Sequence, residues 1–412
     1  MNDCLFYTFT KLMKHNNWKM KDLSIKAEIH STELSKLFNN KKVLSLHYLD
    51  AITKAFELPE GAFYNEYVKL CFNERNLLDK RRSSAFIYQC AKYGFNSELS
   101  LILSVIIKEK SVAIRTRYLK NVFSIAEKLF IEGKEKEAAP LYEFIIEHMP
   151  NSINEEVAIS YFRKFYLTRL TSEGNIVLER VLEYISYMPT KFQELTILWI
   201  TATYYSLKQW DEVLIYAKRL EEIAKIKDHL GRALMYQAFA LTRLGGSLEE
   251  VLSLIDKYEK INDYYADLAV GNRYVAFIDF GNINVVDSYY SWICNRDDVH
   301  VGIPRIIECY VKLGRLEDAE IFIEKYQVQI AQLSDTSNFH MKHLYMEYRY
   351  AVGLLKCKTN KLHEGLDALL NVASEVKNDK IYGDFQKCLL AIWDYRNFFD
   401  NELEGKYIRA LS

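Results

Sequence analysis

Apolar residues recur at helical spacing through most of the chain, and the first sixty residues show the most specific pattern. The spacing predicts a first helix over about 20–27 and a second over 31–38, with Ile29 at the corner between them. The buried positions of the two helices are predicted to be Leu23, Ala27, Leu34 and Leu37. Such a pair is typical of a helix-turn-helix, whose second helix enters the major groove of DNA.

Polar residues on and after the second helix form a candidate DNA-reading surface. We expect the hydroxyls of Ser31 and Thr32 to cap this helix, because side-chain oxygens there accept hydrogen bonds from its first free amides. The predicted DNA-contacting residues are Ser31, Thr32, Glu33, Lys36, Asn39, Asn40, Lys41 and Lys42. Of these, Lys41 and Lys42 suit phosphate contacts. The alternative is a helical dimerisation cap without DNA contact.

The helical spacing continues until Pro59 and Gly61 break the run. The segment 4–67 resembles the Cro/phage-repressor class of helix-turn-helix domains at its apolar positions. It departs at Glu28, where the class usually has Gly, and at Met20, where it usually has Gln. We expect the backbone at Glu28 to avoid the left-handed conformation, which costs a residue with a Cβ about 1 kcal/mol.

From about Ala113 onward the chain repeats a helical hairpin. The predicted turn residues are Gly133, Gly174, Gln209, Gly245, Gly281, Gly314 and Asn360. Most intervals between them lie near 34 residues, about the tetratricopeptide period. Met149-Pro150 and Met188-Pro189 are expected to end two of the second helices, because proline stops helix propagation. Stacked hairpins build a right-handed superhelix with a concave surface lined by the first helices.

The pattern therefore predicts an all-α protein, in which a helix-turn-helix bundle precedes a tetratricopeptide-like right-handed α-solenoid. The predicted domains are a DNA-binding domain at 1–68, a connecting hairpin at 69–112, repeats at 113–381, and capping and dimerisation helices at 382–412. The helices of the connecting hairpin are expected at 76–92 and 97–108. Residues 327–340 are expected to form a long connection or an extended helix.

The repeat register selects candidate residues for a concave binding surface. The inward positions are Trp199, Thr203, Arg232, Phe239, Arg243, Asp279, Glu308 and Lys312, with Asn272 one residue out of register. An Asn amide can bracket a peptide backbone, and Arg232 or Arg243 could receive a C-terminal carboxylate bidentately. The alternative is that these are ordinary surface residues of a solenoid.

Charge is distributed unevenly along the chain. Residues 1–58 carry nine Lys and no Arg against six Asp or Glu, whereas the whole chain has a net charge of −1. A basic N-terminal domain, called the head below, followed by a slightly acidic remainder of the chain is typical of a DNA-binding protein. A net charge this small attracts DNA only weakly in one chain. Two chains would double the contact with DNA, so we expect a homodimer. Its predicted apolar contact is Tyr382, Phe385, Leu389, Ile392, Trp393, Phe398 and Phe399.

The sequence carries little candidate chemistry. It has no phosphate-binding loop, no dinucleotide fingerprint and no H-E-x-x-H motif. His340 and His343 are expected to be exposed helical residues rather than metal ligands. Seven scattered cysteines without a C-x-x-C pair favour buried thiols in a reducing cytoplasm. No signal peptide and no membrane-spanning run of about 18 apolar residues is present. We therefore expect a cytoplasmic protein with no cofactor, no metal and no enzymatic activity.

The join between head and repeats adds a resemblance. It reads F-Y-N-E-Y-V-K-L-C-F-N, then K-R-R-S-S-A-F-I-Y-Q-C-A-K-Y-G-F-N-S-E-L-S-L-I-L and Y-L-K-N-V-F-S-I-A-E-K-L-F-I-E-G. With the helix-turn-helix and the repeats, it resembles the RRNPP family of peptide-sensing regulators of Gram-positive bacteria and their phages, most closely the arbitrium receptors.

This resemblance implies a cytoplasmic dimer that binds operator DNA. A short linear peptide alters its DNA affinity, in quorum sensing or in the choice between lysis and lysogeny. One alternative is a tetratricopeptide interaction scaffold without DNA binding. Another is an anti-activator or phosphatase-like relative that lacks a reading head. The recognisable helix-turn-helix favours the regulator over both.

Overall fold

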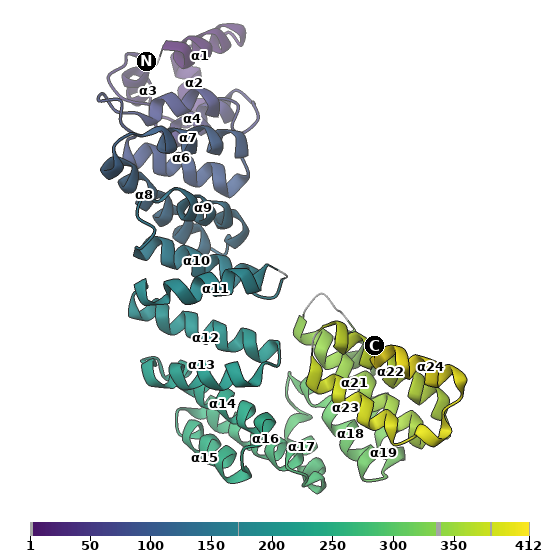
Figure 1. Cartoon of the computed structure of the whole chain (residues 1–412). Helices are drawn as coiled ribbons and strands as arrows, with labels where there is room; N and C mark the ends of the chain where they lie inside the picture. The colour runs from purple at the N-terminus through teal and green to yellow at the C-terminus, as the bar shows by residue number, and fades with distance from the viewer. Residues whose placement is uncertain (1–2, 172, 335–338, 380, 412) are drawn as a thin grey trace. The chain divides into compact units, whose positions relative to one another are not determined.

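A computed structural model describes residues 3–171, 173–334, 339–379 and 381–411 (Figure 1). Within these ranges the chain is helical, with one isolated antiparallel bridge between Phe72 and Leu78 and no β-strand. It divides into two compact units, Met1–Phe192 and Gln193–Ser412, called unit 1 and unit 2 below. The predicted all-α class, with a helix-turn-helix bundle before helical repeats, is confirmed.

Unit 1 begins with the head and continues into stacked hairpins. Its helices are α1 Asp3–His15, α2 Met20–Lys26, α3 Ser31–Phe38, α4 Leu46–Ala55, α5 Tyr64–Tyr67, η1 Val68–Cys71, α6 Lys80–Tyr93, α7 Asn96–Lys108, α8 Val112–Ile131, α9 Glu135–His148, α10 Glu155–Thr168, α11 Gly174–Tyr184 and η2 Ile185–Tyr187. One hydrophobic core runs from α1 to α10. The predicted core positions of the head are all buried: Leu23, Ala27, Ile29, Leu34 and Leu37.

The turn between α2 and α3 corrects one prediction. Glu28 has a φ of 55°, so its backbone is left-handed after all. Its amide donates to the carbonyl of Ile25, and the amide of Ile29 donates to the carbonyl of Ser24 at 3.1 Å. These two bonds close the last turn of α2, and they require a left-handed residue between them. The chain therefore turns between α2 and α3 without a glycine, at a cost in backbone strain at Glu28.

The connecting hairpin starts later than predicted. Its first helix, α6, begins at Lys80 rather than at residue 76. The side chain of Asp79 accepts a hydrogen bond from the amide of Arg82 at 2.9 Å and so fixes the start of the helix. The guanidinium of Arg82 donates to the carbonyls of Leu70 and Phe72, which ties η1 to α6.

Unit 2 holds the later hairpins. α12 Thr190–Ser206 runs into it, followed by α13 Trp210–Ile223, α14 Lys227–Leu244, α15 Leu248–Glu259, α16 Asp263–Asp279, η3 Ile283–Val285, α17 Val286–Ile293, η4 Val299–Val301, α18 Ile303–Lys312, α19 Leu316–Lys325, α20 Gln327–Leu333, α21 Phe339–Lys358, α22 Leu362–Asn378, α23 Tyr382–Trp393, η5 Arg396–Phe398 and α24 Asn401–Leu411. In the segment 327–340, α20 ends at Leu333, and residues 335–338 lie outside the described residues.

The hairpin turns use one backbone device. The left-handed turn residues are Gly133, Lys208, Gly245, Gly281, Gly314 and Asn360. The predicted register is correct at five of these positions. It is wrong by one residue at Gln209, because Lys208 takes the left-handed conformation with a φ of 54°. The amide of Lys208 donates to the carbonyl of Tyr205, and the amide of Gln209 donates to Tyr204, both at 3.0 Å.

Gly174 is not a turn residue of this kind. It is the first residue of α11, and a Cβ there would lie 2.7 Å from the carbonyl oxygen of Thr168. Glycine is needed at this position for close approach of the backbone rather than for a left-handed angle. By contrast, α9 ends at His148 and η2 ends at Tyr187, directly before Met149-Pro150 and Met188-Pro189, as predicted.

Candidate functional sites

The second helix of the head, α3, presents polar side chains on the surface of unit 1. Leu34 and Leu37 are completely buried and anchor the helix on the core. Among the predicted DNA-contacting residues, Glu33 is half-buried and the other seven are exposed: Ser31, Thr32, Lys36, Asn39, Asn40, Lys41 and Lys42. The structure therefore leaves all of them accessible to a ligand.

The cap of α3 differs from the prediction. The N-cap residue is His30, whose Nδ1 accepts a hydrogen bond from the amide of Thr32 at 3.4 Å. Ser31 and Thr32 are the first two residues of the helix instead, so their hydroxyls do not supply the cap. At the other end, Asn40 is left-handed with a φ of 56°. The amide of Lys41 donates to the carbonyl of Lys36 at 2.8 Å and closes the helix.

Glu33 holds two of the candidate lysines. Its carboxylate accepts a hydrogen bond from Nζ of Lys36 at 2.8 Å and another from Nζ of Lys42. These hydrogen bonds lower the pKa of Glu33 to about 2, so the carboxylate stays ionised at any pH used for DNA binding. Lys41 has no such partner among the described residues. Glu33 thus cancels positive charge on the surface that DNA would approach.

Substitution of Glu33 by Gln is expected to raise affinity for non-specific DNA about tenfold at low salt, because two lysines become free to displace counterions. Glu57→Gln is the matched control, since it removes the same charge at an exposed position of the same domain. Fluorescence anisotropy with a labelled duplex measures both variants across a salt series. An unchanged or weaker affinity in Glu33→Gln would contradict this expectation.

Unit 2 contains a cavity of about 190 Å³ that is lined by residues from α12 to α18. Its aromatic lining is Tyr205, Trp210, Phe239, Tyr258, Tyr289 and Trp292. Its polar lining is Thr242, Arg243, Asn272, Asp279, Asp298 and Arg305. Four residues predicted from the repeat register therefore meet at this cavity: Phe239, Arg243, Asn272 and Asp279. The amide of Asn272 donates to the hydroxyl of Tyr258 at 2.8 Å, which fixes its orientation.

Two arginines share one carboxylate in this cavity. Oδ1 of Asp279 lies 2.8 Å from Nη1 of Arg305, and Oδ2 lies 3.4 Å from Nη2 of Arg243. The side chain of Asp279 is 13% exposed and that of Arg243 is 45% exposed, so the pair faces solvent on the Arg243 side. Burial opposes the charge on Arg305, but the Asp279 carboxylate outweighs it and raises the pKa of Arg305.

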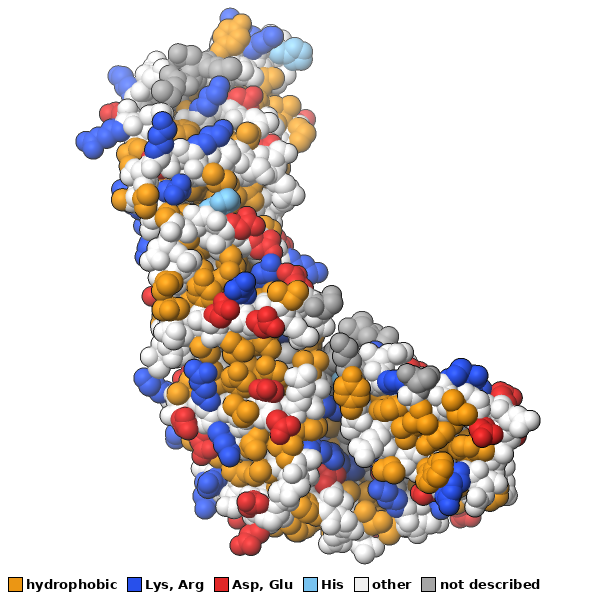
Figure 2. All heavy atoms as spheres, viewed as in Figure 1, with side chains coloured by type: hydrophobic (Ala, Val, Ile, Leu, Met, Phe, Trp, Pro, Cys, Tyr) orange, Lys and Arg blue, Asp and Glu red, His pale blue; other side chains and the backbone are white. Residues whose placement is uncertain are grey.

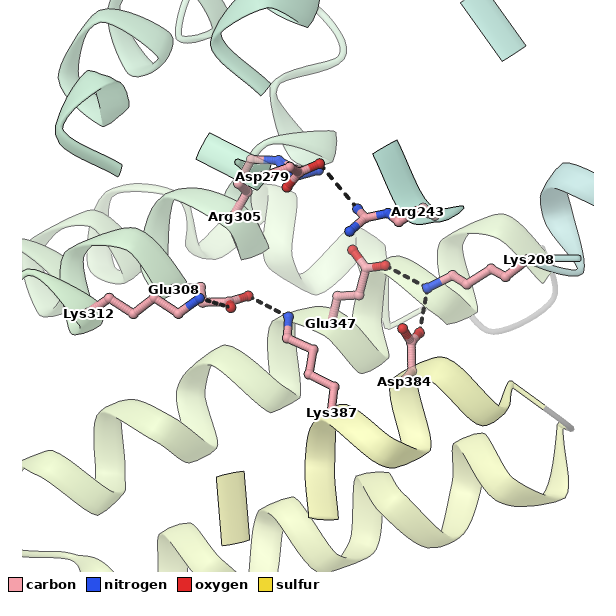
Figure 3. Close-up of polar contacts among 9 residues, drawn as sticks. All are labelled: Lys208, Arg243, Asp279, Arg305, Glu308, Lys312, Glu347, Asp384 and Lys387. Carbon is pink, nitrogen blue, oxygen red and sulfur yellow. Dashed lines mark hydrogen bonds and ion pairs between the residues drawn. The ribbon is translucent and has the colours of Figure 1, made fainter. Parts of the chain in front are cut away.

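A larger polar network adjoins the two arginines (Figure 3). Nζ of Lys208 lies 2.8 Å from Glu347 of α21 and also pairs with Asp384 of α23. Glu308 of α18 pairs with Lys312 at 2.9 Å and with Lys387 of α23 at 2.8 Å. With Arg243, Asp279 and Arg305, the network holds five cations and four anions, and so one net positive charge.

The neighbouring cations also set the ionisation of the network. Partial removal from water would raise the pKa of the half-buried Glu347, but Lys208 and Arg305 oppose this effect and the pKa falls to about 2. Burial likewise opposes ionisation of Glu308, whose pKa is nevertheless lowered by Lys387 and Lys312. Both carboxylates are therefore charged at neutral pH, and the network is held by ion pairs throughout.

The register predicted only part of this site. Glu308 and Lys312 belong to the network, whereas Trp199, Thr203 and Arg232 do not line the cavity. Thr203 was predicted wrongly, because it is buried and its hydroxyl donates to the carbonyl of Trp199 at 2.7 Å. Arg232 pairs with Asp228 at 3.2 Å. The sequence reasoning missed Lys208, Arg305, Glu347, Asp384 and Lys387, whose partners lie far away along the chain.

Other candidate chemistry is limited in the described residues. They contain no group of three or more His, Cys, Asp or Glu placed to hold a metal ion. His343 is buried at 5% exposure, so the prediction that it is an exposed residue is wrong. Burial lowers the pKa of His343 to about 4. The side chain of His340 lies outside the described residues. None of the described helices is long and apolar enough to cross a membrane.

The C-terminal helices carry an exposed apolar surface. Of the predicted contact residues, Tyr382, Trp393 and Phe398 are exposed, whereas Ile392 is fully buried. Phe385, Leu389 and Phe399 are half-buried. Leu390, Ile408 and Leu411 are also exposed, and Figure 2 shows hydrophobic side chains on this part of unit 2. The predicted contact is thus partly core and partly surface, and the sequence missed three of its exposed members.

Comparison with known proteins identifies the head. Residues 8–61 match the Cro/C1-type HTH DNA-binding domain, so the N-terminal helices form a DNA-binding domain of that type. No curated protein matches the chain. Among solved structures, the chain is similar to the selenomethionine structure of phAimR, with 14% sequence identity and a TM-score of 0.45. That alignment covers 98% of this chain and 100% of that one.

Proposed function

We propose that this protein is a DNA-binding transcriptional regulator whose DNA affinity is controlled by a short peptide held in unit 2. The observation that carries the proposal is the combination of a Cro/C1-type head with an aromatic cavity that is lined by charged residues. The resemblance to the RRNPP family and its arbitrium receptors implies the same combination of a DNA-binding head and a peptide-binding repeat region. In this role the protein is a cytoplasmic, non-enzymatic switch in lysis–lysogeny or quorum-sensing control.

DNA binding is supported by the geometry of the head. Residues of α3 are exposed while its apolar face is buried, as in a recognition helix. Ser31, Thr32, Glu33 and Lys36 are proposed to reach base edges, with Asn39 to Lys42 on the phosphates. Gel-shift assays with fragments from upstream of the gene test this step. Absence of any sequence-dependent shift would favour an interaction scaffold instead.

Peptide control is supported by the cavity and the network in unit 2. A linear peptide of roughly five to ten residues offers backbone groups for Asn272 and charged ends for the ion-pair network. A bound peptide that bridges several hairpins would change their relative packing, because each hairpin contacts mainly its neighbours. In a dimer this change would alter the spacing of the two heads and hence operator affinity.

Calorimetry against candidate peptides encoded beside the gene tests peptide control, followed by DNA affinity with and without peptide. Arg243→Ala is expected to lose the peptide response while DNA binding is kept, because Arg243 lies far along the chain from the head. If no peptide binds below about 100 micromolar, or if binding leaves DNA affinity unchanged, the peptide switch is wrong.

A homodimer is the proposed functional form. One recognition helix covers too few bases for operator specificity, and the exposed apolar side chains of α23, η5 and α24 offer a contact surface. Light scattering at micromolar concentration is expected to give the mass of two chains. A monomer, both free and on DNA, would exclude this assembly.

A further inference from the structure

The cavity in unit 2 is lined by aromatic rings and also by arginines whose positive charge is not fully neutralised. The rings of Trp210, Phe239, Tyr258 and Trp292 contribute to its lining. Trp292 packs directly against Gly271, where a Cβ would lie 2.2 Å from the indole. The glycine therefore lets the indole lie close against α16 as part of the wall.

The charge at this cavity is unbalanced by one. Arg243 and Arg305 both pair with the carboxylate of Asp279. The network around them, which includes Glu347 and Glu308 acting on Arg305, holds five cations against four anions. A second acid of the lining, Asp298, is already paired with Arg296, whose Nε lies 2.9 Å away. A guanidinium presents paired donors that match a carboxylate, and two of them can hold two carboxylates. The cavity is therefore complementary to one additional carboxylate.

The size of the cavity limits what that carboxylate carries. A dry protein cavity of about 150 Å³ holds a benzene molecule. At about 190 Å³, this cavity has room for one aromatic or branched aliphatic side chain. The C-terminal residue of a peptide bears its carboxylate and its side chain on the same carbon. Its carboxylate can therefore pair with the arginines while its side chain packs against the aromatic rings.

We infer that the cavity binds a carboxylate attached to a large apolar group, and that the controlling peptide ends in a residue such as Phe, Leu or Met. Its terminal carboxylate lies beside Arg243 and Arg305, on the side away from Asp279, and its last side chain enters the cavity. The peptide part of this inference rests on the proposed function, whereas the carboxylate chemistry rests on the cavity alone.

Small probes test the cavity without any variant. N-acetylphenylalanine, its amide and N-acetylalanine are titrated into the full chain, with tryptophan fluorescence as the signal because Trp210 and Trp292 line the cavity. The acid is expected to bind saturably. The amide and the alanine derivative are each expected to bind at least about tenfold more weakly. The amide loses a charged hydrogen bond, and the alanine derivative loses the apolar contact. Equal binding of acid and amide, or no binding of the acid, would overturn the inference.

Variants then locate the carboxylate. Arg243→Gln and Arg305→Gln are each expected to weaken binding of N-acetylphenylalanine about tenfold. Arg273→Gln is the matched control, because Arg273 lies on α16 but pairs with Asp256 and Glu259 outside the cavity lining. Equal losses in all three variants would show a general effect of charge and would contradict the assignment.

Hexapeptide mixtures with a fixed last residue identify the source of the carboxylate. Mixtures that end in Phe with a free carboxylate are expected to bind better than those that end in Ala or in an amide. If peptides alter DNA affinity without any such preference, the inference fails and the proposed function stands. If N-acetylphenylalanine binds and no peptide does, the cavity serves a free carboxylic acid and the peptide switch fails.

Discussion

Simultaneous replacement of Lys36, Lys41 and Lys42 by alanine is expected to lower DNA affinity at least about 100-fold near physiological salt. Each lysine on a phosphate adds about one unit to the slope of log affinity against log salt concentration. The slope should therefore fall by about two for each head through Lys41 and Lys42, whereas Lys36 is proposed to contact base edges. Fluorescence anisotropy across a salt series measures both quantities. The loss should extend to unrelated sequences, because phosphate contacts carry little sequence information.

The matched control for this triple variant replaces Lys11, Lys14 and Lys54, which are exposed on α1 and α4 of the same domain. It removes the same charge but leaves the surface of α3 intact. Its effect on affinity is expected to be several times smaller. Equal losses in the two triple variants would mean that the head attracts DNA only through its overall charge, and the assignment of α3 as the reading helix would be wrong.

Replacement of Lys208 by alanine is expected to destabilise unit 2 by about 1–3 kcal/mol, because Glu347 and Asp384 would lose the cation that joins them. The value lies below that for a fully buried pair, since the two acids are 44% and 33% exposed. Lys208→Gly removes the same charge but relieves the left-handed backbone, so it should recover about 1 kcal/mol relative to alanine. Urea denaturation of both variants measures the difference.

The effect of Lys208 should depend on pH with a definite sign. The pKa of Glu347 is lowered to about 2 in the folded chain, so its ion pair stabilises the fold above the unfolded pKa of about 4.3. That contribution is lost as the pH falls through about 2. The stability gap between wild type and Lys208→Ala should therefore be full at pH 7 and small near pH 2. A gap that is independent of pH would assign the loss to packing.

The fold was predictable because its signals are local. The spacing of Leu23 and Leu34 relative to nearby apolar residues identifies the buried face of each helix within one or two turns. Glycines such as Gly245 and Gly314 mark the turns of the hairpins. Two errors arose where an unusual residue occupies a left-handed position. Glu28 and Lys208 both stand where glycine would be the obvious signal, so one conformation and one register were wrongly assigned.

The candidate sites were less predictable because their contacts are long-range. The candidates on α3 follow from helical periodicity, and the other four directly follow the helix in the sequence. By contrast, Lys208 meets an acid 139 residues later and another 176 residues later. No local pattern encodes such pairs. Arg305 was missed although it lies on the same helix as Glu308 and only 26 residues from Asp279. The register identified Arg243 and Asp279 because these two lie on successive first helices of the repeat.

The long sequence separation between Lys208 and Asp384 also bears on how the chain is made. At about 5–20 residues per second, a ribosome needs roughly 10–35 s to add the 176 residues between them. During that interval Lys208 is already synthesised, but Asp384 is not, and Glu347 is added only 139 residues after Lys208. The intervening helices α13 to α22 can therefore pack on their neighbours first, and the ion pairs of Lys208 are complete only when α23 has been made. The ion pairs that join the first turn of unit 2 to α21 and α23 can therefore form only after the hairpins between them have been synthesised.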